Sequence, residues 1–370
     1  MMDLHGIISA YRGSPELGAL VESRTASALT FAGRYRLVDF ALSNMKAAGV
    51  YNVSVVMQKN YQSLMDHIGS GKDWDMSKKN GGLTLLPPFG MGSGKGAYSG
   101  LLEALLAAES YVKRVKENNI VIMPGNLAIN IDLKAVLKDH VASGAGVTVV
   151  CAEGLDCGEY HKYTTDEQGF VVEALYQRAG STVAGVADLD VFIVKKEVLL
   201  EMLDFAAAHM RYAFHADGIN EYLKRGGKVK VYLHNGYAAQ IKTVEGYMKA
   251  NMEMLSKANR KALFPVERPV LTNDRADVST YYSEESVVAN SLVSDGCFIE
   301  GTVKNCILSP GVTVGKGAVL ENCIVMRDAY IGDGVTMKNV ICDKFARVEA
   351  AKELIGSDNI PVVIPRGYTT

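Results

Sequence analysis

Hydrophobic residues in the first two thirds of the chain fall into short continuous runs and into longer stretches with helical spacing. The short runs, at residues 4–10, 51–57, 119–123 and 147–151, predict buried strands. Residues 97–116 carry Leu, Ala, Tyr and Val at intervals of three and four, which predicts an amphipathic helix. Short strands that alternate with helices of about ten residues or more predict a mainly parallel, three-layer α/β domain.

Turn and cap residues refine this pattern. Residues 33–44 follow a polar loop and predict the start of a helix that packs against the first strand. Asp132 and Gly144 occupy the positions of an N-cap and a C-terminal glycine, which predicts a helix over residues 133–143. The turn sequence at residues 166–169 predicts an antiparallel pair of short strands. Further strands are predicted at residues 190–194 and 228–233, and further helices at 197–208 and 244–259.

The length and the proline distribution predict two domains. A chain of 370 residues exceeds the size of one typical hydrophobic core. Two prolines within residues 264–269 interrupt the helical pattern, as is typical of a linker. We therefore expect a first domain at residues 1–262, a linker at 263–278 and a second domain at 279–370.

The second domain contains an internal repeat. Asn followed by two apolar residues recurs at a spacing of 17 residues, in segments 305–307, 322–324 and 339–341. Apolar residues followed by Gly at near-hexapeptide intervals predict a three-sided parallel β-helix. Cys306 and Cys323 hold equivalent positions, so we expect their side chains to stack inside it. The exposed last coil needs a cap, which residues 352–370 are expected to supply.

Composition narrows the possible functions. A net charge of −2 supplies no field that would attract nucleic acid or an anionic membrane, so neither is expected as a partner. No basic segment followed by an apolar run opens the chain, and no apolar stretch approaches the ~20 residues of a membrane span, so we expect a cytoplasmic protein. The six cysteines and seven histidines show no spacing of a disulfide framework or metal site. Residues 72–79, which include Trp74, predict a mobile, solvated loop.

Four groups of residues together resemble a known enzyme family: Arg24, residues 33–44, Gly236 with Tyr237, and residues 247–252. With the α/β domain and the β-helix, almost the whole chain resembles the ADP-glucose pyrophosphorylase (glucose-1-phosphate adenylyltransferase) family. The resemblance implies a nucleotidyltransferase-like (Rossmann-like) three-layer domain followed by a C-terminal left-handed parallel β-helix. It also implies a reaction that joins ATP and glucose 1-phosphate and releases pyrophosphate, with Mg²⁺ and cationic side chains neutralising the phosphates.

The chain departs from the family at the phosphate-binding loop, which follows the first strand at the carboxyl edge of the sheet. In the family this loop is a Gly-Gly-x-Gly-Thr-Arg-Leu turn, whose arginine stabilises the departing pyrophosphate. Tyr11 and Arg12 replace two of the glycines, and Glu16 replaces the arginine. The family's Gly-Thr-Ala-Asp-Ala element has no match in residues 92–99. A carboxylate ~4 Å from a triphosphate is repelled by several kcal/mol at an effective dielectric constant of about 20, so ATP is not expected to bind in the catalytic pose.

Further family positions are also changed. Asn126 replaces the carboxylate of a Gly-Asp-His turn and Gln240 that of a Trp-Arg-Asp-Val-Gly run, so two expected Mg²⁺ ligands have become uncharged amides. Ala26 replaces the lysine of an Arg-Ala-Lys-Pro element. Gln177 replaces the lysine that grips glucose 1-phosphate, and residues 186–188 replace a Ser-Met-Gly run. These losses predict a site that holds Mg²⁺ and sugar phosphate poorly.

The resemblance and the departures together predict a chain that is catalytically inactive or very weak alone. We expect a glycogen biosynthesis regulatory or structural subunit that modulates a catalytic ADP-glucose pyrophosphorylase subunit, in a homo- or hetero-tetramer. No catalytic residue, cofactor or metal is predicted, although the family uses Mg²⁺. The alternatives are an active nucleotidyltransferase that uses other residues, and a β-helix acyltransferase, whose usual histidine is missing after His234.

The same resemblance implies a site for phosphorylated effectors between the two domains. Arg24, Arg34 and Arg36 are the candidate residues for it. In the alternative interpretation, Arg34, Arg36 and Asp39 form a structural network that ties the first helix to the sheet.

Overall fold

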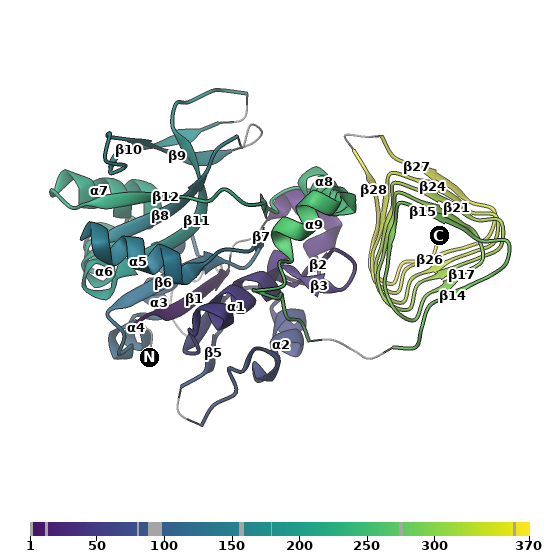
Figure 1. The fold of residues 1–370 in the computed structure, drawn as a ribbon, viewed down its shortest axis with the longest axis horizontal. Coiled ribbons are helices and arrows are strands. Elements are labelled where there is room, and N and C mark those ends of the chain that lie inside the picture. Colours follow the sequence, from purple (N-terminus) through teal and green to yellow (C-terminus); the bar gives the residue numbers. More distant parts are fainter. Residues whose placement is uncertain are drawn as a thin grey trace.

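The computed structural model shows an α/β domain beside a triangular β-helix (Figure 1). The structure describes residues 3–11, 14–79, 81–87, 98–154, 159–178, 180–273, 277–357 and 360–370. Arg12 and most of residues 92–99 lie outside these ranges. In the described part of the chain, no helix is long and apolar enough to cross a membrane.

A mixed sheet of nine strands, counted over the described residues, forms the centre of the first domain. The strands are β1 (His5–Ala10), β4 (Val53–Met57), β5 (Leu83–Leu86), β6 (Asn119–Pro124), β8 (Val147–Ala152), β9 (Tyr160–Thr165), β10 (Val171–Gln177), β11 (Val186–Lys195) and β12 (Val229–Leu233). Strand β1 lies between β4 and β6 and is parallel to both. Strand β11 lies antiparallel between β6 and β8, so the sheet is less parallel than the alternation of elements predicts.

Helices cover both faces of this sheet, which confirms the three-layer α/β architecture. The helices of the domain are α1 (Leu37–Ala48), α2 (Gln62–Ile68), α3 (Leu101–Ala107), α4 (Glu109–Arg114), α5 (Leu133–Ser143), α6 (Lys196–His209), α7 (Asn220–Lys224), α8 (Val244–Met252) and α9 (Lys257–Leu263). Helices α1 and α5 pack in one hydrophobic core, and α3, α4 and α6 in the other. The Asp132 side chain caps α5 by accepting from the Lys134 and Ala135 N–H groups, and Gly144 ends α5 in the left-handed conformation, as predicted.

Three predicted elements differ from the structure. Helix α1 begins at Leu37 because the preceding residues form the hairpin of β2 (Thr30–Phe31) and β3 (Tyr35–Arg36). The single helix expected at 97–116 is two helices, α3 and α4, which meet at Ala108. The helix expected at 244–259 is also divided, because Ser256 has an extended backbone between the 3-10 turn Glu253–Leu255 and α9.

The prediction of a solvated loop at residues 72–79 is wrong for Trp74. Trp74 is fully buried within the core beneath α1 and packs edge-on against His67, with 5.9 Å between the ring centroids. A buried tryptophan anchors this segment because its large ring removes much apolar surface from water.

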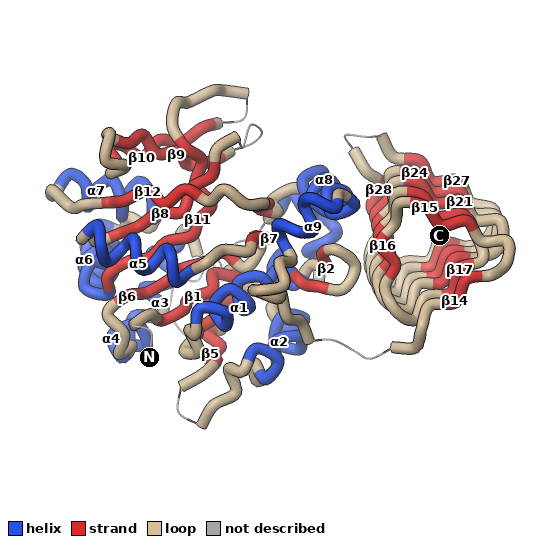
Figure 2. The backbone as a smooth tube through the Cα atoms, in the orientation of Figure 1, coloured by secondary structure: helices blue, strands red, loops and turns tan. Residues whose placement is uncertain are grey.

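The second domain is the three-sided parallel β-helix that the repeat predicts, left-handed as the family resemblance implies, with three parallel five-stranded sheets within the described residues (Figure 2). One sheet contains β14 (Tyr281–Tyr282), β17 (Phe298–Ile299), β20 (Thr313–Val314), β23 (Tyr330–Ile331) and β26 (Arg347–Val348). The second contains β15 (Val287–Ala289), β18 (Thr302–Lys304), β21 (Val319–Glu321), β24 (Thr336–Lys338) and β27 (Glu353–Ile355). The third contains β16 (Leu292–Val293), β19 (Ile307–Leu308), β22 (Ile324–Val325), β25 (Val340–Cys342) and β28 (Val362–Ile364).

The repeated residues explain how each coil turns and stacks. Asn305, Asn322 and Asn339 all have φ close to +52°, a left-handed conformation that asparagine tolerates better than most residues. Cys306 and Cys323 are buried, and the Cys323 N–H donates to Cys306 Sγ at 3.3 Å, which confirms that they stack. The tail that is expected to cap the β-helix, residues 352–370, contributes β27 and β28 to its last coil.

The two domains share a buried contact. Helices α8 and α9 stand beside the β28 face of the β-helix (Figure 1), and one hydrophobic cluster includes Leu20 and Phe40 of the first domain with Ile324 and Ile341 of the second. Gly33 is required in the β2–β3 turn, because it has φ of +86° and an added Cβ would come within 2.9 Å of Ser294 Oγ.

Candidate functional site

A cavity of about 420 Å³ lies where the central strands of the first domain end. Its lining includes Tyr11, Tyr98, Asp188, Asp190, His215 and Lys242. Tyr11 directly follows β1, so the cavity occupies the carboxyl edge of the sheet, where open α/β sheets bind ligands.

Tyr11 changes the start of the phosphate loop. Its side chain is only 5% exposed and packs edge-on against Tyr98, with 5.9 Å between the ring centroids. An aromatic ring therefore lines the cavity at a position where the family has glycine. Glu16 lies in the 3-10 helix η1 (Pro15–Val21) with an exposed side chain.

Asn126 and Gln240 are brought near each other by a two-stranded sheet of β7 (Leu127–Ile129) and β13 (Ala238–Gln240). The Asn126 amide Nδ2 donates to the Ile241 carbonyl at 2.7 Å. Gln240 Nε2 donates to Asp190 Oδ2 at 2.7 Å, while the buried Gln240 Oε1 has no hydrogen-bond partner among the described atoms.

This pair does not fit the Mg²⁺ of the family. Mg²⁺ in such sites is held by one or two carboxylates together with substrate phosphates. Asn126 and Gln240 carry no charge, and both use their N–H₂ groups in hydrogen bonds within the protein. Neither residue therefore supplies the carboxylate that Mg²⁺ takes in such sites.

Two other family positions lie apart from the cavity lining. Gln177 is 4% exposed, and its Oε1 accepts from the Val183 N–H at 3.3 Å. Ala26 is 4% exposed in the hydrophobic cluster between the domains. Both replacements therefore put small or neutral groups where the family has lysine.

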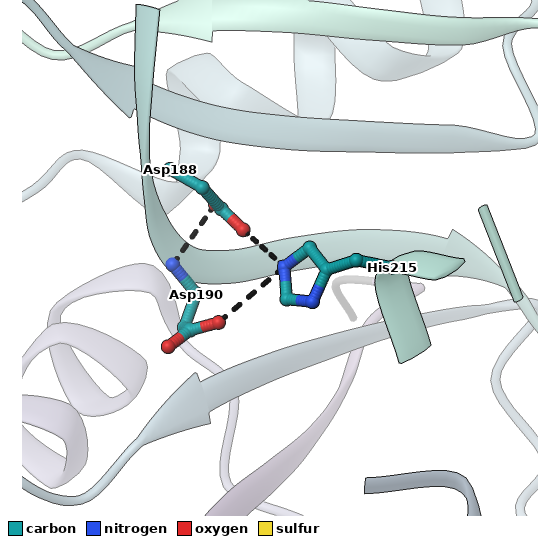
Figure 3. Close-up of side chains that lie close together, drawn as sticks. All are labelled: Asp188, Asp190 and His215. Carbon is teal, nitrogen blue, oxygen red and sulfur yellow. Dashed lines mark hydrogen bonds and ion pairs between the residues drawn. The ribbon is translucent and has the colours of Figure 1, made fainter. Parts of the chain in front are cut away.

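An acidic cluster with one histidine forms the floor of the cavity (Figure 3). His215 Nε2 lies 2.5 Å from Asp188 Oδ2 and 3.5 Å from Asp190 Oδ1. Both aspartates come from β11, at a register shift against β8, and Asp190 has φ of +58°. His215 belongs to the π-helical turn Phe214–Ile219. Burial raises the pKa of Asp188, and the neighbouring His215 acts in the opposite direction.

Sequence analysis did not identify this cluster. The strand predicted at residues 190–194 begins after Asp188, and His215 lies 25 residues beyond Asp190 in a turn without a motif. The only local signal is the Asp-Leu-Asp triplet, because residues two positions apart in a strand point to the same face of the sheet.

A second polar cluster lies between the domains. Arg24 is 2% exposed, forms an ion pair with Asp343 of the β-helix and donates from Nε to the Leu20 carbonyl at 2.8 Å. Lys344 is 8% exposed, and burial lowers its pKa to about 6, aided by Arg36 and Arg24. Arg327 and Arg366 of the β-helix lower it further. This group, Arg24, Arg36, Arg327, Lys344 and Arg366, is called the interdomain cation cluster below.

The three arginines expected at an effector site separate into two groups. Arg24 and Arg36 belong to the interdomain cation cluster, whereas the exposed Arg34 pairs with Asp295 at 3.0 Å. The expected structural network exists in part, because the Arg36 N–H donates to Asp39 Oδ2 at 2.8 Å and Asp39 Oδ1 lies 2.6 Å from His67 Nε2. Lys344, Arg327 and Arg366 were not predicted from the sequence.

Comparison with known sequences agrees with the fold. The nucleotidyl transferase family profile matches residues 17–257, and the GlmU-like C-terminal hexapeptide profile matches residues 277–360. The fold and the cavity at the end of β1 therefore define a protein of the nucleotidyl transferase class that carries a hexapeptide β-helix.

Relatives narrow this class. "Glycogen biosynthesis protein GlgD" of Bacillus subtilis (strain 168) is 34% identical over 362 residues, which are 98% of this chain and 95% of that protein. "Glucose-1-phosphate adenylyltransferase" of Geobacillus stearothermophilus is 30% identical over 321 residues, 85% of this chain and 82% of that enzyme. The same enzyme of Clostridium botulinum (strain Alaska E43 / Type E3) is 29% identical over the same lengths. The chain belongs to the glucose-1-phosphate adenylyltransferase family.

Proposed function

We propose that this chain acts in bacterial glycogen biosynthesis as a cytoplasmic regulatory or structural subunit of glucose-1-phosphate adenylyltransferase. It modulates a catalytic partner chain within a tetramer and has no or very weak catalysis alone. The observation that carries the proposal is the pair of amides, Asn126 and Gln240, at the family's Mg²⁺ positions, with their N–H₂ groups bonded within the protein.

The electrostatics of the cavity support this proposal. Adenylyl transfer requires positive charge near a polyphosphate as negative charge develops in the transition state. Here Asp188 and Asp190 face the cavity, whereas the arginine of the phosphate loop is replaced by Glu16. Without a bound cation, the two carboxylates repel a triphosphate, and Lys242 of the lining offsets only part of that repulsion.

The interdomain cation cluster supports a regulatory role. Five basic side chains gather there, and the ion pair with Asp343 offsets only part of their charge. A phosphorylated small molecule would relieve the mutual repulsion of the arginines, favour the protonated form of Lys344 and accept charge-assisted hydrogen bonds from these side chains. We therefore assign the effector site to Arg24, Arg36 and Lys344 with their neighbours, and leave Arg34 at its edge.

The interdomain cation cluster contacts η1, and a change at the cluster can therefore affect the rest of the first domain. Leu17 and Leu20 of η1 are fully buried in the hydrophobic cluster between the domains, and the Leu20 carbonyl accepts from Arg24. An anion that draws Arg24 towards itself changes the support of the segment following β1. A partner chain packed on this domain can respond to such a change by shifting between less and more active states.

The test is an assay of pyrophosphate release from ATP and glucose 1-phosphate. The chain is measured alone, and then mixed in equal amounts with the catalytic homologue from the same genome. We expect negligible release by the chain alone and an altered substrate affinity or maximal rate of the partner after mixing. Unchanged kinetics on mixing would contradict the regulatory role, and robust release by the chain alone would favour the alternative of an active nucleotidyltransferase.

Two variants make this assay sharper. Arg36→Ala removes one cation of the cluster and should weaken the response of the mixture to phosphorylated effectors, while Arg34→Ala serves as the matched control. The triple variant Glu16→Arg, Asn126→Asp, Gln240→Asp restores the family's charges, and any activity that it gains measures how far those three losses explain the inactivity.

A further inference from the structure

We infer that Asp188, Asp190 and His215 bind a divalent transition-metal ion, for which Zn²⁺ is the best-matched probe. This site is separate from the Mg²⁺ position of the family, which Asn126 and Gln240 occupy. It is also independent of the proposed regulatory function, since it rests only on the side chains at the floor of the cavity.

The geometry of the three side chains fits one ion. One ligand atom from each residue, namely Asp188 Oδ2, Asp190 Oδ1 and His215 Nε2, lies within 4.8 Å of the others. His215 Nε2 is 2.5 Å and 3.5 Å from the two oxygens. Zinc takes nitrogen and oxygen ligands at about 2.0–2.2 Å, so tetrahedral ligand atoms lie about 3.3 Å apart. An ion in the centre replaces the hydrogen bond between His215 and Asp188, with side-chain shifts below about 1 Å.

Neighbouring groups contact each of the three side chains, and Figure 3 shows the hydrogen bond between the Asp190 N–H and Asp188. The Tyr163 hydroxyl donates to Asp188 Oδ2, one of the proposed ligand atoms, at 3.3 Å. Asp188 Oδ1 accepts from the Asp190 N–H at 2.9 Å, and Asp190 Oδ2 accepts from Gln240 Nε2 at 2.7 Å. The His161 ring stacks on His215 with 3.5 Å between centroids and 4° between planes. Metal sites depend on such supporting contacts, because they fix the orientation of the ligands.

The ligand set selects the class of metal. One imidazole nitrogen with two carboxylates suits Zn²⁺ and other transition ions, whereas Mg²⁺ prefers oxygen ligands alone. All three residues are buried, yet all three line the cavity of about 420 Å³. The protein therefore supplies three ligands and leaves the remaining coordination positions facing the cavity, where water or a small anionic ligand can bind.

Without a metal, the same contacts would form a hydrogen-bonded network with a purely structural role. Two features favour the ion. Two carboxylates converge on one nitrogen, although a single carboxylate would satisfy one N–H donor. The buried Gln240 Oε1, on the amide that holds Asp190, lacks a hydrogen-bond partner among the described atoms, and a water bound to the metal would supply a donor there.

The experiment is a Zn²⁺ titration of the metal-free full-length chain in competition with a chromophoric chelator. We expect one Zn²⁺ per chain. Asp190→Asn and His215→Gln each remove one ligand and should weaken binding at least a hundredfold. Gln240→Leu removes only the hydrogen bond to Asp190 and should weaken it about 10- to 100-fold. His209→Gln is the control, since this exposed histidine lies at the end of α6 outside the cavity lining, and the affinity of the variant should equal that of the parent.

Cobalt distinguishes this site from the cysteines. A Co²⁺ complex of the proposed nitrogen and oxygen ligands gives weak visible bands, whereas a thiolate site gives an intense near-ultraviolet charge-transfer band. Circular dichroism of each variant reports its folding, and Asp190→Asn keeps the shape of the side chain if His215→Gln fails to fold. Equal Zn²⁺ affinity of Asp190→Asn and the parent, or a thiolate spectrum, would overturn the inference.

Discussion

Substitution of Lys344 by methionine should stabilise the protein and change how its stability depends on pH. Lys344 is 8% exposed, and its pKa falls from 10.5 to about 6, first because of burial and then because of Arg36, Arg24, Arg327 and Arg366. A lysine with this pKa is largely neutral at pH 7.5 in the folded chain and protonated in the unfolded chain. Folding at that pH therefore includes the free-energy cost of removing a proton.

The sign and size of the effect follow from linkage. Between pH 6 and 10.5 the unfolded state binds one more proton at Lys344 than the folded state, so stability rises with pH in this window. The slope is about 1.4 kcal/mol per pH unit. A pH of 7.5 lies about three units below the pKa of Lys344 in the unfolded chain, so the free-energy cost of removing the proton on folding is on the order of 4 kcal/mol. Lys344→Met keeps most of the volume of the side chain and removes this penalty.

The assay is urea unfolding of the parent and of Lys344→Met at several pH values from 6 to 10. The difference in unfolding free energy should favour the variant and should shrink as pH rises. Lys338→Met is the control, because Lys338 lies in the same β-helix with its side chain 43% exposed beside Glu321. Parallel pH profiles of parent and Lys344→Met would refute the reasoning, as would an equal effect of Lys338→Met.

Two further predictions concern other buried ionisable groups. Arg24→Ala leaves Asp343 buried without its ion-pair partner, so the free energy of unfolding measured in urea should fall by about 3–5 kcal/mol. The double variant Arg24→Met, Asp343→Leu, which removes both charges, should recover a large part of that loss. Burial lowers the pKa of His140 to about 4, with a contribution from Lys195, so the unfolded state binds more protons below pH 6.5 and stability should fall from there towards pH 4. Thermal unfolding of His140→Gln should show a weaker decline in that window, and an identical decline would contradict the assignment.

Local signals were sufficient for much of the fold. The cap at Asp132 and the glycine at Gly144 lie next to the helix that they bound, so the chain segment alone specifies them. The β-helix was equally predictable, since Asn305 and Asn322 mark successive turns of a repeat in which each coil contacts only its neighbours. The burial of Trp74 could not be predicted from the local sequence, because it depends on packing against helix α1 and against His67 in α2.

The candidate sites depended on segments that are distant in sequence. Asn126 and Gln240 could be identified from family motifs, because each replaces one residue in a recognisable run. His215 could not, since it reaches Asp188 from a π-helical turn. The role of Lys344 could not be predicted either, because its neighbours in the interdomain cation cluster come from both domains and only the packed structure brings them together.

The two clusters are suited to ligands of opposite charge. At the floor of the cavity, Asp188 and Asp190 attract cations, and the amides that replaced the family's carboxylates add no charge. Between the domains, cations outnumber the acidic partner Asp343. We therefore expect a free phosphorylated metabolite to be repelled at the cavity and attracted at the domain boundary. Because Arg24 at that boundary also supports η1, a phosphate bound there would change how the domains pack, as the regulatory role that we propose requires.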